Sequence, residues 1–516
     1  MFVVTAEPGG AEREEAELKQ SLVDMKAAMT DEEIDALIAR TQDFAAWTEA
    51  NAQSSGIDAV KAVDVASLPE EGSFYSAETE VADGITYVTS EVESGDLVYL
   101  ELRFDPSFIP ADQLFPYSLA AQYSAYMGTA SHTADEMLNL SAQLLYQFTV
   151  SPTYFIYKDG GYRPSCTVSG TFLKDQVNEA LDYIDEVLFD VDFSDIDRLR
   201  SKMTENVLTE NMAASVMPLV FLDALISQRA KDGAEYAENT NAGFGFSRWQ
   251  REMAAASDEE LGQVAQVAQE VWAQVPRKEN LIIGIAGNAE GIAATRERLA
   301  KTIERLDSTV REAADYSGLE GLEGPVALEI PGTLMYNYQF IPASKYGMEY
   351  DGKLLAVQSV VADKIMMGIL RFQNSAYGAD CGVNEDFAYV SSYRDPEYDK
   401  TFEVYEQVGD LVKALDLTQD DLDGYITSAF SSLATPVGPL TGAKTAIGDA
   451  ISGRTTFADK QRYMGELKQL TVADFAEYAS LFDRLATEGE RVCIGAVQVV
   501  EEHQNDYATI IRDYVE

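Results

Sequence analysis

The two histidines of this 516-residue chain, His132 and His503, are the first residues to consider for metal chemistry. A catalytic zinc site needs three protein ligands and one open coordination position. The segment HTADE at residues 132–136 places a histidine beside two acids, but no second histidine lies near it, and His503 lies in the polar segment EEHQN. We therefore expect His132 to be a surface residue before a helix, and we expect neither a metal site nor a general base in this chain.

Nucleophilic and nucleotide-binding motifs are equally scarce. The three cysteines, Cys166, Cys381 and Cys493, are far apart and form no CxxC pair, which favours reduced structural thiols. No GxxxxGK[ST] loop and no GxGxxG motif after a strand is present. With 87 acidic residues, a pair of carboxylates carries no information about hydrolysis.

The charge balance excludes one class of partner. Lys and Arg total 38 against 87 Asp and Glu, a formal net charge of −49, which repels phosphate backbones and excludes nucleic acid. Such a field attracts basic peptides, or it is simply a solvated acidic surface. No apolar run approaches the roughly 18 residues of a membrane span, and MFVVTAEPGG lacks a basic signal region. We expect a cytoplasmic protein without membrane contact.

The elements that must position any site begin with a helical hairpin. Residues 1–6 favour a lone strand before a Pro-Gly-Gly break, and Leu18, Leu22 and Met25 mark one face of a helix. Thr30 and Glu33 form a capping-box pair that starts a second helix.

Two longer regions follow, and their predicted elements come in the same order. In the first, hairpins are expected around Ser94-Gly95 and around Asp159–Gly161. The strands CTVSGTF and LIIGIAG of the first region match FAYVSSYRD and RVCIGAV of the second, and Ser194 matches Thr418 as a helix N-cap. This order indicates an internal duplication of about 200 residues, too long for a solenoid repeat.

We therefore predict an α+β fold with two tandem homologous domains, each with helices packed on a mostly antiparallel sheet. The expected divisions are a strand and helical-hairpin linker at 1–55, a first α+β domain at 56–306, a linker at 307–329 and a second α+β domain at 330–516.

One motif in the second domain resembles a known family. ILRFQNSAYGADCG at residues 369–382 and SSYRDP at residues 391–396 resemble the C-terminal half of presequence-protease-like enzymes, which belong to the pitrilysin or insulinase-type zinc metallopeptidases. Arg371 and Tyr377 keep the family's spacing of six residues. Asn374 and Ser375 stand where the family has two glycines, and the inverted zinc motif His-x-x-Glu-His, which the family carries in its N-terminal half, is missing here.

The resemblance implies a chain that hydrolyses nothing alone. It implies that zinc lies in a companion N-terminal half, that the substrates are unfolded peptides, and that Arg371 and Tyr377 bind substrate and stabilise the transition state. Gly378, Tyr393 and Arg394 are weaker candidates. From chemistry, a tyrosine hydroxyl and a guanidinium can act as oxyanion donors. The competing interpretations are a surface cation beside a core tyrosine, a peptide-binding or scaffold subunit without a catalytic role, and a degenerate paralogue.

Overall fold

The computed structural model describes residues 10–52, 63–158, 161–240, 243–512 and 514, and it divides the chain into two compact units, Met1–Val63 and Asp64–Glu516. The smaller unit holds two helices, α1 (Gly10–Ala28) and α2 (Asp31–Ala52), as predicted. Thr30 and Glu33 exchange the expected capping hydrogen bonds between their backbone amides and side chains. The strand predicted at residues 1–6 lies outside the described residues.

The larger unit contains a first six-stranded sheet in the order β1-β2-β8-β3-β6-β5. Its strands are β1 (Glu78–Ala82), β2 (Ile85–Glu91), β3 (Leu97–Phe104), β5 (Leu145–Ile156), β6 (Tyr162–Leu173) and β8 (Ile282–Gly287). Among these described strands, only the pair β2 and β8 is parallel, and the other neighbouring strands run antiparallel.

A second six-stranded sheet has the order β11-β12-β10-β13-β9-β14. Its strands are β9 (Val326–Ile330), β10 (Met335–Pro342), β11 (Gly378–Val383), β12 (Phe387–Asp395), β13 (Glu490–Ala496) and β14 (Thr509–Ile511). Here β9 is parallel to both β13 and β14, and the remaining pairs are antiparallel.

The two sheets match strand for strand when the second order is reversed. β2, β8, β3, β6 and β5 then correspond to β9, β13, β10, β12 and β11, with the same strand directions. CTVSGTF lies in β6 and FAYVSSYRD forms β12, so both occupy the same place in their sheets. The predicted tandem α+β architecture is confirmed, and the sheets differ at one edge, where β1 is antiparallel to β2 and β14 is parallel to β9.

Two local predictions are wrong. Ser94-Gly95 does not join a hairpin, because β8 lies between β2 and β3. β8 is apolar and almost wholly buried, so the centre of a sheet suits it better than an edge. The tight hairpin turn is Asp83-Gly84, both with positive φ, between β1 and β2. The first helix equivalent to Gln419–Leu433 is capped by Asp195 rather than Ser194.

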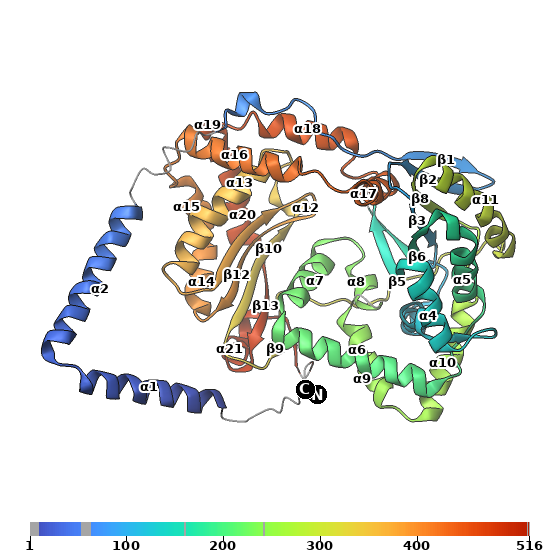
Figure 1. Ribbon diagram of the computed structural model, residues 1–516, viewed down its shortest axis with the longest axis horizontal. Coiled ribbons are helices and arrows are strands. Elements are labelled where there is room, and N and C mark those ends of the chain that lie inside the picture. The colour runs from blue at the N-terminus through green and yellow to red at the C-terminus, as the bar shows by residue number, and fades with distance from the viewer. Residues whose placement is uncertain (1–9, 53–62, 159–160, 241–242, 513, 515–516) are drawn as a thin grey trace. The chain divides into compact units, whose positions relative to one another are not determined.

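Helices cover the outer face of each sheet and form its main core (Figure 1). Those of the first half are α3 (Leu114–Tyr123), α4 (Ala134–Leu144), α5 (Val177–Phe189), α6 (Ile196–Val216), α9 (Phe244–Ala255), α10 (Asp258–Trp272) and α11 (Ala289–Arg305). Those of the second half are α13 (Leu354–Val360), a π-helix (Val361–Arg371), α14 (Tyr398–Glu406), α15 (Val408–Lys413), α16 (Gln419–Leu433), α18 (Phe457–Leu467), α20 (Ala479–Glu488) and α21 (Val497–Glu502). Short elements include α8 (Ala234–Glu238), α12 (Ala343–Tyr346), α19 (Val472–Phe475) and the two-stranded pair β4 (Gly128–Thr129) and β7 (Val191–Asp192).

One helix of each half packs on the sheet of the other half. α7 (Leu219–Ala230) follows α6 and lies against β10 and β13, where Leu222 and Leu225 join the aromatic face of the second sheet. α17 (Pro439–Ser452) follows α16 and lies against β2, β3 and β8, where Ala443 and Ile447 pack (Figure 1). This reciprocal exchange explains why both sheets belong to one compact unit.

No single described helix has the length and hydropathy of a membrane span, and α6 with α7 passes that test only as a pair bent by 101°.

Candidate functional site

Arg371 is delivered by a widened helix. α13 continues directly into the π-helix, which ends at Arg371. Its last turn is closed by five-residue hydrogen bonds, from the Phe372 amide to the Met367 carbonyl at 3.2 Å and from the Asn374 amide to the Ile369 carbonyl at 3.0 Å. π-type turns of this kind are rare and occur often at functional sites. The Arg371 side chain is exposed at the end of this helix.

The turn that follows explains why glycine suits this position. Ser375 has a φ of 70°, in the left-handed region where a side chain is disfavoured. The next residue, Ala376, is buried and its amide binds the Leu370 carbonyl at 2.9 Å. The turn therefore keeps its tight form with serine in place of the family's glycine.

Tyr377 is held by a bulge in β12. Its amide donates to the Tyr393 carbonyl at 3.1 Å and to the Arg394 carbonyl at 3.4 Å, just before Gly378 pairs with Tyr393. Arg394 has a φ of 51°, and the register between β10 and β12 shifts between Met335 and Asn337. A bulge of this kind re-aims side chains at the end of a ladder.

The five sequence-predicted residues come together here. The Arg371 guanidinium lies 5.2 Å from the Tyr377 ring centroid and donates to the Tyr377 carbonyl oxygen. The Arg394 guanidinium lies 5.9 Å from the same ring, and the Tyr377 and Tyr393 centroids are 5.8 Å apart. Gly378 sets the strand register beneath them.

Exposure and charge distinguish this cluster from ordinary packing. Tyr377 is 60% exposed, so it is not the core aromatic of the competing interpretation. Within the described parts of the chain, its hydroxyl has no hydrogen-bond partner, and no carboxylate pairs with Arg371 or Arg394. Nearby Tyr336 has its pKa raised by burial, although Arg394 lowers it. The arrangement offers one hydroxyl and two cationic donors to an anionic group.

The histidines and cysteines have other surroundings. Among the described residues, no three His, Cys, Asp or Glu side chains form a group that could hold a metal. His132 precedes α4 as predicted, and its Nδ1 lies 2.9 Å from Glu186 Oε2, a hydrogen bond that raises the His132 pKa. The cysteines are free and buried, and burial raises the pKa of Cys166 and of Cys493 to about 12.

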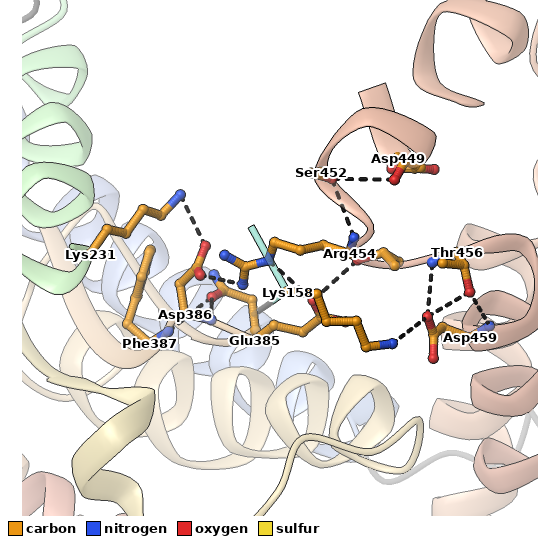
Figure 2. Close-up of polar contacts among 12 residues, drawn as sticks. Lys158, Lys231, Glu385, Asp386, Phe387, Asp449, Ser452, Arg454, Thr456 and Asp459 are labelled. Carbon is orange, nitrogen blue, oxygen red and sulfur yellow. Dashed lines mark hydrogen bonds and ion pairs between the residues drawn. The ribbon is translucent and has the colours of Figure 1, made fainter. Parts of the chain in front are cut away.

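Sequence reasoning missed a cluster of charges where the halves meet (Figure 2). Lys231, just after α7, lies 3.0 Å from Asp386, and Arg454, just after α17, also pairs with Asp386. Both exchanged helices thus end at one acidic turn between β11 and β12. Adjoining cavities of about 480 Å³ and 570 Å³ are lined by these residues. No local pattern could reveal this cluster, because Asp386 and Arg454 are 68 residues apart.

Two family descriptions match the chain. Residues 4–218 match the associated domain of peptidase family M16, subfamily C, and residues 337–499 match "PreP C-terminal domain". Protein HypA of Clostridium perfringens is 20% identical over 98% of this chain and 52% of its own length. Presequence protease 1, chloroplastic/mitochondrial, of Arabidopsis thaliana is 20% identical over 97% of this chain and 46% of its own length.

The chain thus spans about half the length of the curated relatives it matches. Among solved structures, the peptidase M16 inactive domain from Pseudomonas fluorescens matches with a TM-score of 0.53 and 12% identity, covering 82% of this chain and 98% of that one. The fold is therefore shared with a domain described as inactive. Together with the two family descriptions, this shows that the chain belongs to the M16 peptidases and corresponds to their C-terminal half.

Proposed function

We propose that this chain is the non-catalytic half of a presequence-protease-like zinc peptidase. It closes a peptide chamber and supplies Arg371 and Tyr377 to a zinc-bearing N-terminal half, which is either part of the same gene product or a separate subunit. The described residues hold no cluster fit for zinc, so the metal is assigned to that companion. Zinc there would polarise the scissile carbonyl of an unfolded peptide.

The observation that carries this proposal is the exposed Tyr377 hydroxyl beside two guanidinium groups that no described carboxylate neutralises. In a chain with 87 acids, pairing would be the ordinary state of a surface arginine. Attack on a peptide carbonyl places negative charge on its oxygen. A hydroxyl aimed at that oxygen is typically worth about 3 kcal/mol. The guanidinium of Arg371 can bind the neighbouring substrate carbonyls or the same oxyanion.

An exposed apolar stripe supports a docked partner. Leu208, Met212 and Val216 recur every four residues on α6 and are 63%, 62% and 67% exposed. An apolar row of this kind on a strongly acidic protein is costly in water and marks an interaction surface. We assign it to the companion half, which the relatives carry in the other part of their length.

Mixing the chain with its zinc-bearing half tests the proposal. We expect a complex by sedimentation velocity, peptide hydrolysis only in the mixture, and one zinc that remains with the companion. Leu208→Ser with Met212→Ser should weaken the complex while the melting temperature stays unchanged. A complex that forms without any gain in hydrolysis would favour the scaffold interpretation.

A further inference from the structure

A small cavity lies on the polar face of the first sheet, away from Arg371. Glu101 and Arg103 of β3 face the same side as Ser169 and Thr167, their register partners on β6. α17 covers one end of this face, where Ala443 packs near Val88. The uncovered end holds a cavity of about 350 Å³. Its lining includes Thr86, Arg103, Asp105, Phe155, Arg163 and Asn280.

Arg103 is a buried arginine with one unused edge. It is 7% exposed, and its Nε and Nη2 lie 2.9 Å and 2.8 Å from Glu101 Oε1. The Phe155 ring stacks on it, 3.9 Å from Cζ, and Tyr99 donates to the second oxygen of Glu101 at 2.8 Å. Its Nη1, however, is buried without a hydrogen-bond partner in the described structure. Buried donors are rarely left unpaired, because the loss of water is then uncompensated.

A second guanidinium stands at the rim. Arg163 is the register partner of Phe155 on the neighbouring strand, and its guanidinium lies 4.0 Å from the Tyr157 ring centroid. The acid in the lining, Asp105, is already engaged: Oδ1 accepts the Ser107 amide at 2.9 Å, and Oδ2 accepts Asn280 Nδ2 at 2.7 Å. The lining thus brings two guanidinium groups and one carboxylate to the cavity, a local positive balance in a strongly acidic protein.

We propose that this cavity binds a single carboxylate group carried by a peptide. A guanidinium fixed along one edge by Glu101 is pre-organised to donate from its other edge, once the stacked Phe155 ring yields to the ligand. The net charge of −49 disfavours phosphates and other multiply charged anions. Phe155 and Tyr157 supply apolar contact for the residue that bears the carboxylate. That the bearer is a peptide rests on the proposed function, whereas the binding itself needs no companion half.

Isothermal titration calorimetry on the full 516-residue chain can test this site. The probes are N-acetyl-tetra-alanine as the free acid, its C-terminal amide, and that amide with one alanine replaced by glutamate. We expect the free acid to bind about tenfold or more tightly than the amide. Tight binding of the glutamate-bearing amide would assign the site to acidic side chains, and weak binding would assign it to chain ends.

Arg163→Gln should reduce affinity for the free acid about tenfold. The matched control is Arg305→Gln, since Arg305 also stacks on an aromatic ring, Phe189 at 4.1 Å, and pairs with Asp190 on the surface. The control should bind as the unchanged protein does. Glu101→Gln combined with Arg103→Gln removes the buried pair without leaving a lone charge, and if folded it should also lose binding.

Equal affinity for free acid and amide, or no measurable binding of either, would overturn the proposal. So would full affinity in Arg163→Gln, or an equal loss in Arg305→Gln. Tyr377→Phe should leave this binding intact, so a failure here is distinguishable from a failure of the proposed function, which concerns hydrolysis with the companion half.

Discussion

Each half of the larger unit turns from a helix toward its edge strand through the residues Ser-Ala-Tyr, but the two turns present their tyrosines differently. In the first half, the Tyr126 carbonyl accepts Nε of Arg198 at 3.3 Å, and Arg198 pairs with Asp135 at 3.1 Å. In the second half, the Tyr377 carbonyl accepts Nη1 of Arg371, and no described carboxylate neutralises that arginine. Tyr126 is 39% exposed and Tyr377 is 60% exposed.

The difference follows from one added element. In the first half, α4 stands between the turn and β5, and its first turn carries Asp135. In the second half, Tyr377 enters β11 directly, so no described helix equivalent to α4 supplies an acid. Six residues before Tyr126 lies Ala120, fully buried, where the second half has Arg371. The same architecture thus has one turn completed by structural contacts and one turn left with open donors.

Removal of the arginine from each turn should separate function from structure. Arg371→Ala should lower kcat/KM of the reconstituted enzyme about a hundredfold, because a charged donor to the transition state is lost. Arg198→Ala should instead lower the melting temperature, since Asp135 and the Tyr126 carbonyl lose their donor, with normal kcat/KM in the folded fraction. Steady-state kinetics and thermal melts of both variants check this. Equal kinetic losses would mean that both arginines act only by holding the fold.

The joint between the halves should depend on Asp386. Asp386→Asn leaves Lys231 and Arg454 without full charge compensation, and their side chains are only 28% and 21% exposed. We expect a loss of about 2 kcal/mol in the free energy of unfolding, measured with urea. The control is Asp190→Asn in the first half, whose pair with Arg305 is exposed at 40% and 43%. It should cost less than about 0.5 kcal/mol, and an equal cost would remove Asp386 from the joint.

The serines of the two turns should respond to glycine with opposite signs. Ser375 has a φ of 70°, so Ser375→Gly should stabilise the protein by about 0.5 kcal/mol after the entropic cost of glycine. Ser124 has a helical φ of −50° and starts a short 3₁₀ turn, so Ser124→Gly should destabilise by about 0.5 to 1 kcal/mol. Chemical denaturation of both variants decides. A loss of stability in Ser375→Gly would contradict the strain argument.

The smallest expected effect is a pH dependence confined to the first turn. The hydrogen bond to Glu186 raises the pKa of His132 in the folded state. Its stabilising contribution is therefore complete below the unfolded pKa of about 6.5 and is lost as the pH rises through the higher folded value. His132→Gln should flatten that part of the urea midpoint curve between about pH 6 and 8. An unchanged curve would mean that the His132 contact does not contribute.

Local patterns predicted part of this account. Capping boxes at Thr30 and Thr418 were predictable because their partners lie three residues away. Arg371 and Tyr377 could be paired from spacing, since one helix end and one turn connect them. The place of β8 between β2 and β3 could not be read locally, because its partners lie far away in the chain and Ser94-Gly95 imitates a hairpin turn.

Long-range assembly also concealed the remaining sites. The exchange of α7 and α17 needs both halves folded together, so neither helix pattern reveals which sheet it covers. The Arg103 cavity likewise depends on strands that the chain visits at widely separated points, with Asp105 and Asn280 separated by 175 residues. Its signal in the sequence is limited to the alternation Tyr-x-Glu-x-Arg along β3, which places three polar residues on one sheet face.

The most direct test compares kcat/KM of the reconstituted enzyme carrying Tyr377→Phe with that carrying Tyr126→Phe. Both changes remove one hydroxyl and keep the aromatic ring, so neither should move the melting temperature by more than a degree or two. The account predicts a loss of about a hundredfold for Tyr377→Phe, equal to about 3 kcal/mol of transition-state stabilisation. It predicts no loss for Tyr126→Phe. Wild-type turnover by Tyr377→Phe, or an equal loss in both variants, would contradict the claim that only the second turn supplies a donor to the transition state.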